Sequence, residues 1–209
     1  MFKILLTFVL SMSLTICGFS QDLPSGSKAG PMDSVEYSVV AAVVKADHLP
    51  KHPRWFMLSN RTTTFECDPP ANTGFSFVGC SGMRTQDQSP QDVYNMLAGS
   101  LHSLTTEVFL DLMSKSETST VVDKTLPLNV KQIIWGPTST SSVPKELGAP
   151  DFAVYHSRVG FNKEKTLALV YVAAANWTDS SKTYGEYVML GWQEGGWTIL
   201  ERYKMWSMK

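Results

Sequence analysis

Cysteine is scarce in this sequence, and its spacing argues against the common thiol chemistries. The 209 residues include three cysteines, and no two of them form a Cys-x-x-Cys pair. That spacing is typical of zinc sites and of dithiol redox centres. His48 and His52 are four residues apart, but Pro50 breaks the helix that would present both to one metal ion. The sequence therefore predicts no metal site and no cofactor.

A large net charge of either sign is also missing. The chain has 18 Lys and Arg residues against 19 Asp and Glu residues, which gives a formal charge of -1. This balance provides no global field to attract nucleic acid, so nucleic acid is not an expected partner. The hydrophobic content of 43% and the aromatic content of 11% are those of a packed globular protein. At this length we expect one domain.

The start of the chain has the features of an export signal. Lys3 precedes an apolar run over residues 4–10, which is too short and too interrupted for a transmembrane helix. Small residues end this stretch. We interpret residues 1–20 as a secretory signal peptide that is cleaved after Ser20.

The export signal and the residues that follow it predict the location of the protein. Residues 21–32 are rich in Pro, Gly and small polar residues and indicate a flexible leader. Cys17 offers the alternative of a lipoprotein anchor, which the bulky Ile16 before it disfavours. We expect a secreted or periplasmic protein with no transmembrane segment in the mature chain.

The two remaining cysteines, Cys67 and Cys80, are predicted to form a disulfide. Two cysteines in an oxidising compartment most often pair. The segment between them contains Pro and Gly residues and has little means of holding its own shape. A bridge there would close a loop of about 14 residues and stabilise the fold by roughly 3 kcal/mol in the chain-entropy model. We interpret this segment as a loop inserted in the domain.

Helices are predicted in the first half of a single α+β domain over residues 33–209. Asp33 and Glu36 have the spacing of a capping box and predict a helix over residues 34–46. Ser89 followed by Pro90 marks another helix start. The apolar residues beyond it recur at helical spacing, and they predict either one bent helix or two short ones.

Strands dominate the second half. Short linkers with hairpin residues, at 162–166 and 193–196, join the last four strands in two pairs, so an antiparallel sheet is the simplest arrangement. Residues 167–172 are apolar at both parities, which places that strand at the centre with helices on one face. Helices first and sheet last is an architecture like that of cystatin-like and NTF2-like folds. The predicted strands are residues 55–65, 126–135, 152–161, 167–174, 184–192 and 197–206.

The C-terminal strands also resemble a known group of proteins. Ser-Arg-Val-Gly-Phe-Asn at 157–162, Leu-Ala-Leu-Val-Tyr-Val at 167–172 and Met-Trp-Ser at 205–207 are similar to uncharacterised exported bacterial proteins. The resemblance extends over residues 152–207. It implies a bacterial source and a helix-then-sheet fold, and it implies no known activity. The segment between Cys67 and Cys80 departs from the group.

Arg158 is the candidate binding residue in this pattern. In a strand it shares a face with His156 and Gly160, and a guanidinium suits a fixed carboxylate or phosphate partner. Glu201 of the final hairpin is the acid that could complete a site. The alternative is an ion pair that ties the sheet to a helix or to an acid such as Glu201 or Glu186. Ser157 beside His156 cannot act as a nucleophile and base pair without a bulge, because adjacent strand residues point to opposite faces.

Trp192 and Trp197 add a second candidate surface. Cross-strand packing explains most of the aromatic residues in the last hairpin. Exposed rings among them would form a platform for a sugar or a peptide.

These features support three hypotheses about function. The first is a non-enzymatic exported domain that binds a small molecule, a peptide or an envelope protein on the concave side of its sheet. The second is a small hydrolase or isomerase that uses Arg158, His156 and Glu201 in the same concavity. The third is a structural, envelope-associated protein.

Overall fold

The structure is a computed structural model, and it describes residues 30–49, 53–65, 83–84, 88–136, 145–176 and 179–208. Six strands form one mixed sheet in the order β2-β1-β3-β4-β5-β6. β1 pairs in parallel with β2 and β3, and the remaining neighbours are antiparallel. The strands are β1 (Trp55–Ser59), β2 (Lys131–Trp135), β3 (Phe152–Phe161), β4 (Leu167–Asn176), β5 (Tyr184–Gln193) and β6 (Gly196–Ser207).

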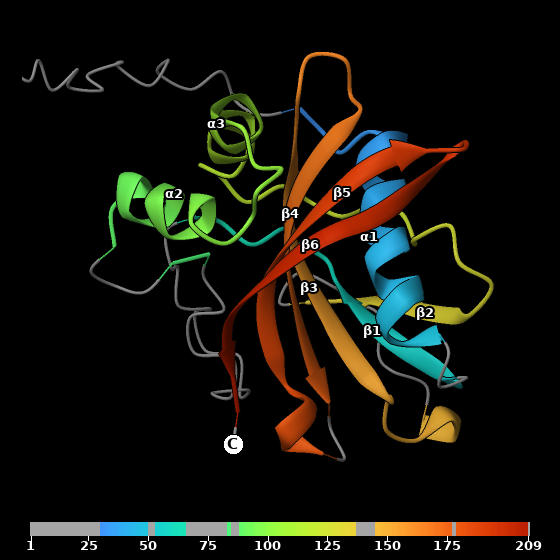
Figure 1. The fold of residues 1–209 in the computed structure, drawn as a ribbon. Helices are drawn as coiled ribbons and strands as arrows, with labels where there is room; N and C mark the ends of the chain where they lie inside the picture. Colours follow the sequence, from blue (N-terminus) through green and yellow to red (C-terminus); the bar gives the residue numbers. More distant parts are fainter. Residues whose placement is uncertain are drawn as a thin grey trace, which may run out of the picture.

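Helices cover both faces of this sheet (Figure 1). α1 (Ser34–Asp47) packs on one face, and α2 (Pro90–Ala98) and α3 (Thr106–Lys115) pack on the other. β4 shows the division most clearly. Its residues 168, 170 and 172 join the cluster under α1, whereas residues 169, 171 and 173 join the cluster under α2 and α3. This period-2 alternation explains why the strand is apolar at both parities.

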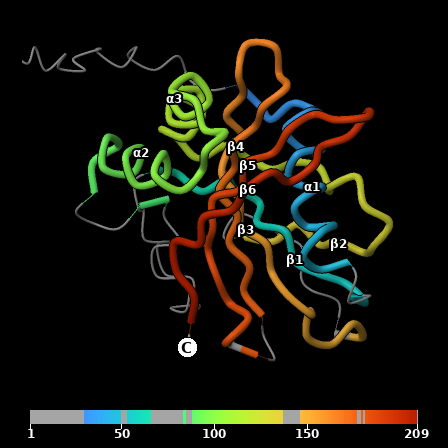
Figure 2. Tube along the Cα trace, viewed as in Figure 1, coloured from blue at the N-terminus to red at the C-terminus, as the bar shows by residue number. Residues whose placement is uncertain are grey.

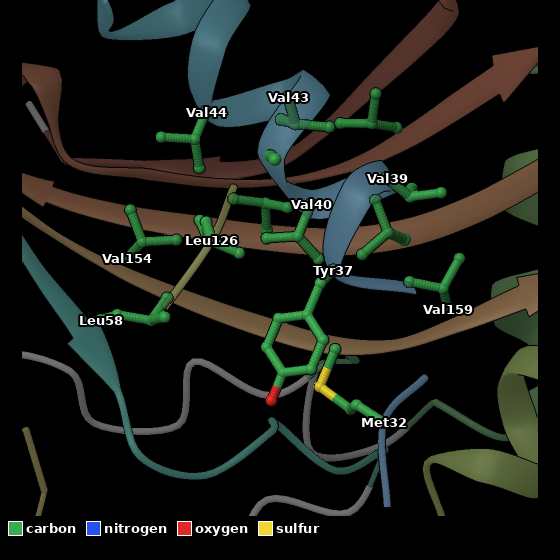
Figure 3. Close-up of a cluster of buried hydrophobic side chains, with 14 of the residues drawn as sticks. Met32, Tyr37, Val39, Val40, Val43, Val44, Leu58, Leu126, Val154 and Val159 are labelled. Atoms are coloured by element: carbon green, nitrogen blue, oxygen red, sulfur yellow. The ribbon is translucent and has the colours of Figure 1, made fainter. Parts of the chain in front are cut away.

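α1 begins as its sequence predicts. The Asp33 carboxylate accepts a hydrogen bond from the Glu36 backbone N–H at 2.9 Å, and the Glu36 carboxylate accepts one from the Asp33 N–H at 3.0 Å. The buried side of the helix then meets β3 and β1, as Figure 3 shows. The residues that meet there include Val39, Val40, Val43 and Val44 of α1, Val154 and Val159 of β3, and Leu58 of β1.

The opposite layer depends on a close approach between α3 and β3. A Cβ on Gly160 would overlap the Val108 carbonyl oxygen and would lie 2.6 Å from the Leu112 backbone nitrogen. Contacts this short do not occur for real Cβ atoms, so glycine lets the helix backbone rest on the strand. α2 and α3 are separate helices, which settles the choice between one bent helix and two short ones.

The α+β class, with helices ahead of a C-terminal sheet, is confirmed. The last four strands are antiparallel as predicted, and β3 has the predicted bounds. Four details differ. The sheet is mixed because β1 and β2 add in parallel, and helices lie on both faces rather than one. The predicted strand over 55–65 ends at Ser59, and the predicted strand over 126–135 begins at Lys131.

α1 and β6 come from the two ends of the described chain and lie side by side (Figure 2). Trp197 and Ile199 of β6 pack against the cluster under α1. Two surface hollows open along this border between α1 and β6. None of the helices within the described ranges is long and apolar enough to cross a membrane.

Candidate functional site

Arg158 lies in the interior and is held by the start of α1. Its side chain is 5% exposed, and its Nε and Nη2 each donate to the Glu36 carboxylate at 2.8 Å. The remaining donor group, Nη1, donates to the Gly30 carbonyl oxygen at 2.6 Å and to Thr120 Oγ1 at 3.1 Å. The guanidinium is therefore fully engaged by the protein. The predicted ion pair between sheet and helix is confirmed, but its acid is Glu36 and not Glu201 or Glu186.

Glu36 is equally saturated. Besides Arg158 and the capping box, its Oε1 accepts the Val159 backbone N–H at 3.1 Å. That N–H is free to turn toward α1 because β3 has a bulge between His156 and Val159. The bulge also moves Gly160 to the α3 side, so the expectation that Gly160 shares a face with Arg158 is wrong. The Glu36 carboxylate thus caps α1, pairs with the buried Arg158 and accepts the backbone N–H of Val159 at the bulge.

His156 is also buried, next to this ion pair. Its Nδ1–H donates to the Ser157 carbonyl oxygen at 2.9 Å, and its buried Nε2 has no hydrogen-bond partner among the described residues. Burial lowers the pKa of His156, because the charged imidazolium would lose its hydration. Ser157 Oγ donates to the Arg158 carbonyl at 2.5 Å and accepts the Tyr171 N–H at 3.0 Å. β3 does have a bulge here, but the Ser157 hydroxyl donates to the Arg158 carbonyl and not to His156, so the two side chains do not form a nucleophile and base pair.

Glu201 lies on the other face of the sheet. Its carboxylate accepts the Ser103 backbone N–H at 3.0 Å, in the connection between α2 and α3, and lies 3.4 Å from His102 Nδ1. The hydrogen bond from Ser103 lowers the pKa of Glu201. The predicted combination of Arg158, His156 and Glu201 is wrong, since two members are buried on the α1 face and the third lies on the α3 face.

Trp192 and Trp197 form an exposed aromatic pair. They lie opposite each other in the β5–β6 hairpin, with ring centroids 5.3 Å apart and an interplanar angle of 71°. Trp192 is 47% exposed, whereas Trp197 packs against Phe161 and the cluster under α1. The cross-strand packing is confirmed, and one ring remains accessible.

The Trp pair lines a groove of about 590 Å3 between α1 and the hairpin. Small side chains on α1 leave this space open, namely Ala41, Ala42 and Ala46. Pro127 and Leu128 close the groove from the connection before β2. The hairpin reaches this position through a tight turn in which Glu194 has φ 49° and Gly195 has φ 82°.

A second hollow is polar. A cavity of about 640 Å3 opens where β3 and β5 begin and β4 and β6 end, beside the last residues of α1. Its wall combines charges from several elements that are far apart in the sequence. The charged residues that line it are Asp47, Arg54, Asp151, Lys182, Glu186, Arg202 and Lys204.

Arg202 organises the charges of this cavity. Its Nη1 and Nη2 donate to the two Asp47 oxygens at 3.0 and 2.6 Å, and Nη1 also donates to Glu186. Burial alone would lower the pKa of Arg202, but the hydrogen bonds and charges of Asp47 and Glu186 raise it above its ordinary value. Burial raises the pKa of Glu186, and the charge of Arg202 offsets part of that rise. Arg202 faces α1 because the bulge at Leu200 reverses the alternation of β6.

An aromatic stack completes the wall. The centroid of the His48 ring lies 4.0 Å from that of Phe152 and 6.4 Å from that of Tyr184, and the ring planes are nearly parallel. The Tyr184 hydroxyl donates to Asp47 at 3.1 Å. Burial, followed by the charges of Asp47 and Glu186, raises the pKa of Tyr184 strongly. No sequence pattern pointed to this cavity, because its residues come from separate elements and none forms a local motif.

Together, the fold and these hollows define an α+β domain with a mixed sheet between two helix layers, and the two hollows described above lie beside α1. No protein-family model matches the sequence, and neither the curated proteins nor the solved structures contain a significant match. The likeness to cystatin-like and NTF2-like folds is therefore an analogy of architecture only.

Proposed function

We propose that this protein is an exported, non-enzymatic binding domain that holds an extended, mostly apolar peptide segment of a secreted or envelope protein. The site is the groove between α1 and the β5–β6 hairpin. The observation that carries this proposal is Trp192, which is 47% exposed although it belongs to a packed aromatic pair. Exposed tryptophans rimming a concave surface are frequent binding hot spots.

The chemistry of the groove favours a peptide over a sugar. Sugars are held by several convergent hydrogen-bonding side chains, whereas the lining here is dominated by Ala, Pro, Leu and Trp. Ser38 lines the groove, but its hydroxyl already donates to the Val35 carbonyl at 2.7 Å. Lys45 supplies one cation, which suits an acidic residue in the bound segment.

The location differs from the concave sheet face that the sequence indicates. α1 covers one face of the central strands, and α2 and α3 cover the other. A ligand is therefore better accommodated beside α1. The alternative of a small hydrolase or isomerase loses its support, because Arg158 and His156 are buried and Glu201 lies on the opposite face.

A peptide array can test this proposal. We expect the mature protein to bind a subset of apolar 12-residue peptides, and Trp192→Ala to weaken that binding about thirtyfold, as for a hot-spot tryptophan. Ala46→Arg, at an exposed groove position, should block it as well. Val121→Ala is the control, since Val121 is 54% exposed and does not line the groove.

Three outcomes would count against this assignment. The array yields no binder, the binders tolerate both groove substitutions, or Val121→Ala weakens binding as much as Trp192→Ala. A parallel array of oligosaccharides separates the two ligand classes. Binding there that depends on Trp192, with none on the peptide array, would replace the peptide by a sugar.

A further inference from the structure

The polar cavity at the C-terminal end of α1 is a separate candidate site. Its volume of about 640 Å3 lies in the range of small-molecule pockets. It shares no lining residue with the Trp groove. An inference about this cavity is therefore independent of the peptide proposal.

The acids of the cavity wall already have hydrogen-bond donors within the protein. Asp47 accepts two hydrogen bonds from Arg202 and one from Tyr184. Glu186 accepts from Arg202. Asp151 accepts the Arg54 backbone N–H at 2.6 Å and lies 3.4 Å from the Arg54 guanidinium. Each carboxylate thus has donors of its own and does not require a cationic ligand.

The cations of the wall are less completely used. Lys204 has no carboxylate within ion-pair distance among the described residues, and its Nζ lies 6.0 Å from the centroid of the Tyr184 ring. It is exposed and borders the cavity. Lys182 pairs with Asp179, which does not line the cavity. The lining holds four cations, Arg54, Lys182, Arg202 and Lys204, against three carboxylates, Asp47, Asp151 and Glu186, so its formal charge is +1.

We propose that this cavity binds a small organic anion through a carboxylate or phosphate group that pairs with Lys204. The Lys204 ammonium approaches the ligand from β6. The His48, Phe152 and Tyr184 stack supplies an apolar wall for the body of the ligand. A lysine ammonium is a point charge that accepts either kind of anion.

Calorimetric titration of the exported chain tests this inference. The probes are inorganic phosphate and succinate, each titrated at a fixed ionic strength set with chloride. We expect at least one of them to bind, and Lys204→Gln to weaken its binding about tenfold, because a charge-assisted hydrogen bond is lost. Ser207→Asp places a negative charge in the same wall and should abolish binding.

Lys163→Gln is the matched control. Lys163 lies in the turn between β3 and β4, at the other end of the sheet. Its substitution by glutamine removes the same charge as Lys204→Gln. Its variant should bind the probe as the wild type does. Preference for phosphate or for succinate identifies the anionic group. The inference is overturned if neither probe binds, if Lys204→Gln binds normally, or if Lys163→Gln is weakened equally. None of these results bears on the proposal that the Trp groove binds a peptide.

Discussion

Arg158 illustrates how the same residue can look functional in a sequence and prove structural in the fold. A guanidinium in a strand suits an anionic ligand, but here Glu36 provides that anion from within the protein. Each partner satisfies the other, and further bonds to Gly30, Thr120 and Val159 use the remaining donors and acceptors. Removing one partner of such a buried pair would leave an uncompensated charge, at a cost of about 3–5 kcal/mol.

His156, beside this pair, predicts a pH-dependent stability. Its pKa is lowered in the folded state by burial, so the unfolded chain takes up the proton first as the pH falls. Stability contributed by the neutral ring is complete above the ordinary pKa and is lost as the pH falls below it. Since the ordinary value is about 6.5, lowering the pH from 7.5 to 5.0 should cost at most about 2 kcal/mol through this group.

Urea unfolding of the wild type and of His156→Gln at both pH values measures this effect. The charged neighbours of the ring are Glu36 and Arg158, which remain in the variant. Glu186 acts in the opposite direction, because its raised pKa favours the folded state as the pH falls, and it is present in both proteins. The variant should lose less stability than the wild type. An equal loss in both proteins would rule out His156 as the source.

At the scale of elements, the packing of α3 on β3 depends on a missing side chain. Gly160 lies in a strand, where glycine is normally unfavourable, and its lack of a Cβ permits the contact with Val108 and Leu112. Gly160→Ala should therefore destabilise the fold by about 1–3 kcal/mol, since the helix must move away from the strand. Thermal and urea unfolding measure the change.

Gly99 provides the control for this substitution. It follows α2 with a right-handed φ of -72°, and a Cβ there would make only ordinary contacts at 3.6 Å. Gly99→Ala should be neutral or slightly stabilising, because alanine reduces the freedom of the unfolded chain. If Gly160→Ala is equally harmless, the close approach of α3 does not depend on glycine.

The elements themselves were largely predictable, because their signals are local. The Asp33 and Glu36 capping box, the Ser89 and Pro90 helix start and the double apolar parity of β4 each lie within a few residues. The parallel addition of β1 and β2 was not predictable, since nothing local encodes which distant strand a short strand joins. Bulges were missed for the same reason, and they decide the faces of Gly160 and Arg202.

A candidate site was predictable from the sequence only where its residues belong to a single hairpin. Trp192 and Trp197 are five residues apart and face each other across a turn, so the sequence indicated the pair. The polar cavity combines α1 with the ends of four strands, and its ion pairs join residues as far apart as Asp47 and Arg202. Such contacts depend on the finished packing of α1 against β6.

At the scale of the whole molecule, the two helix layers cover both faces of the central strands. Within the described residues, the Trp groove and the polar cavity both lie along the border of α1, one beside the hairpin and one at the helix end. The α2 and α3 layer also anchors both flanks of residues 66–82. Phe65 and Met83 belong to one buried cluster, and the Arg84 guanidinium lies 5.3 Å from the centroid of the Phe65 ring.

These anchored flanks support the proposed disulfide between Cys67 and Cys80, which lie outside the described residues. Exported to an oxidising compartment, the protein should lose residues 1–20 and pair these cysteines. Expression of the full sequence in a bacterial host, with fractionation and N-terminal sequencing, should find a soluble periplasmic or secreted chain that starts at Gln21. Alkylation under denaturing, non-reducing conditions should detect no free thiol, whereas reduction should release two.

Cys17→Ser separates export from lipid anchoring. If the signal is cleaved after Ser20, Cys17 leaves with it, and the variant should fractionate as the wild type does. A lipoprotein would instead remain in the membrane fraction until Cys17 is replaced, because the acylated cysteine would be its anchor.

Two alkylated cysteines in the unreduced protein would contradict the disulfide between Cys67 and Cys80. In an exported protein, a bridge that closes a loop of about 14 residues would stabilise the fold by roughly 3 kcal/mol in the chain-entropy model, which is why we expect these two cysteines to pair.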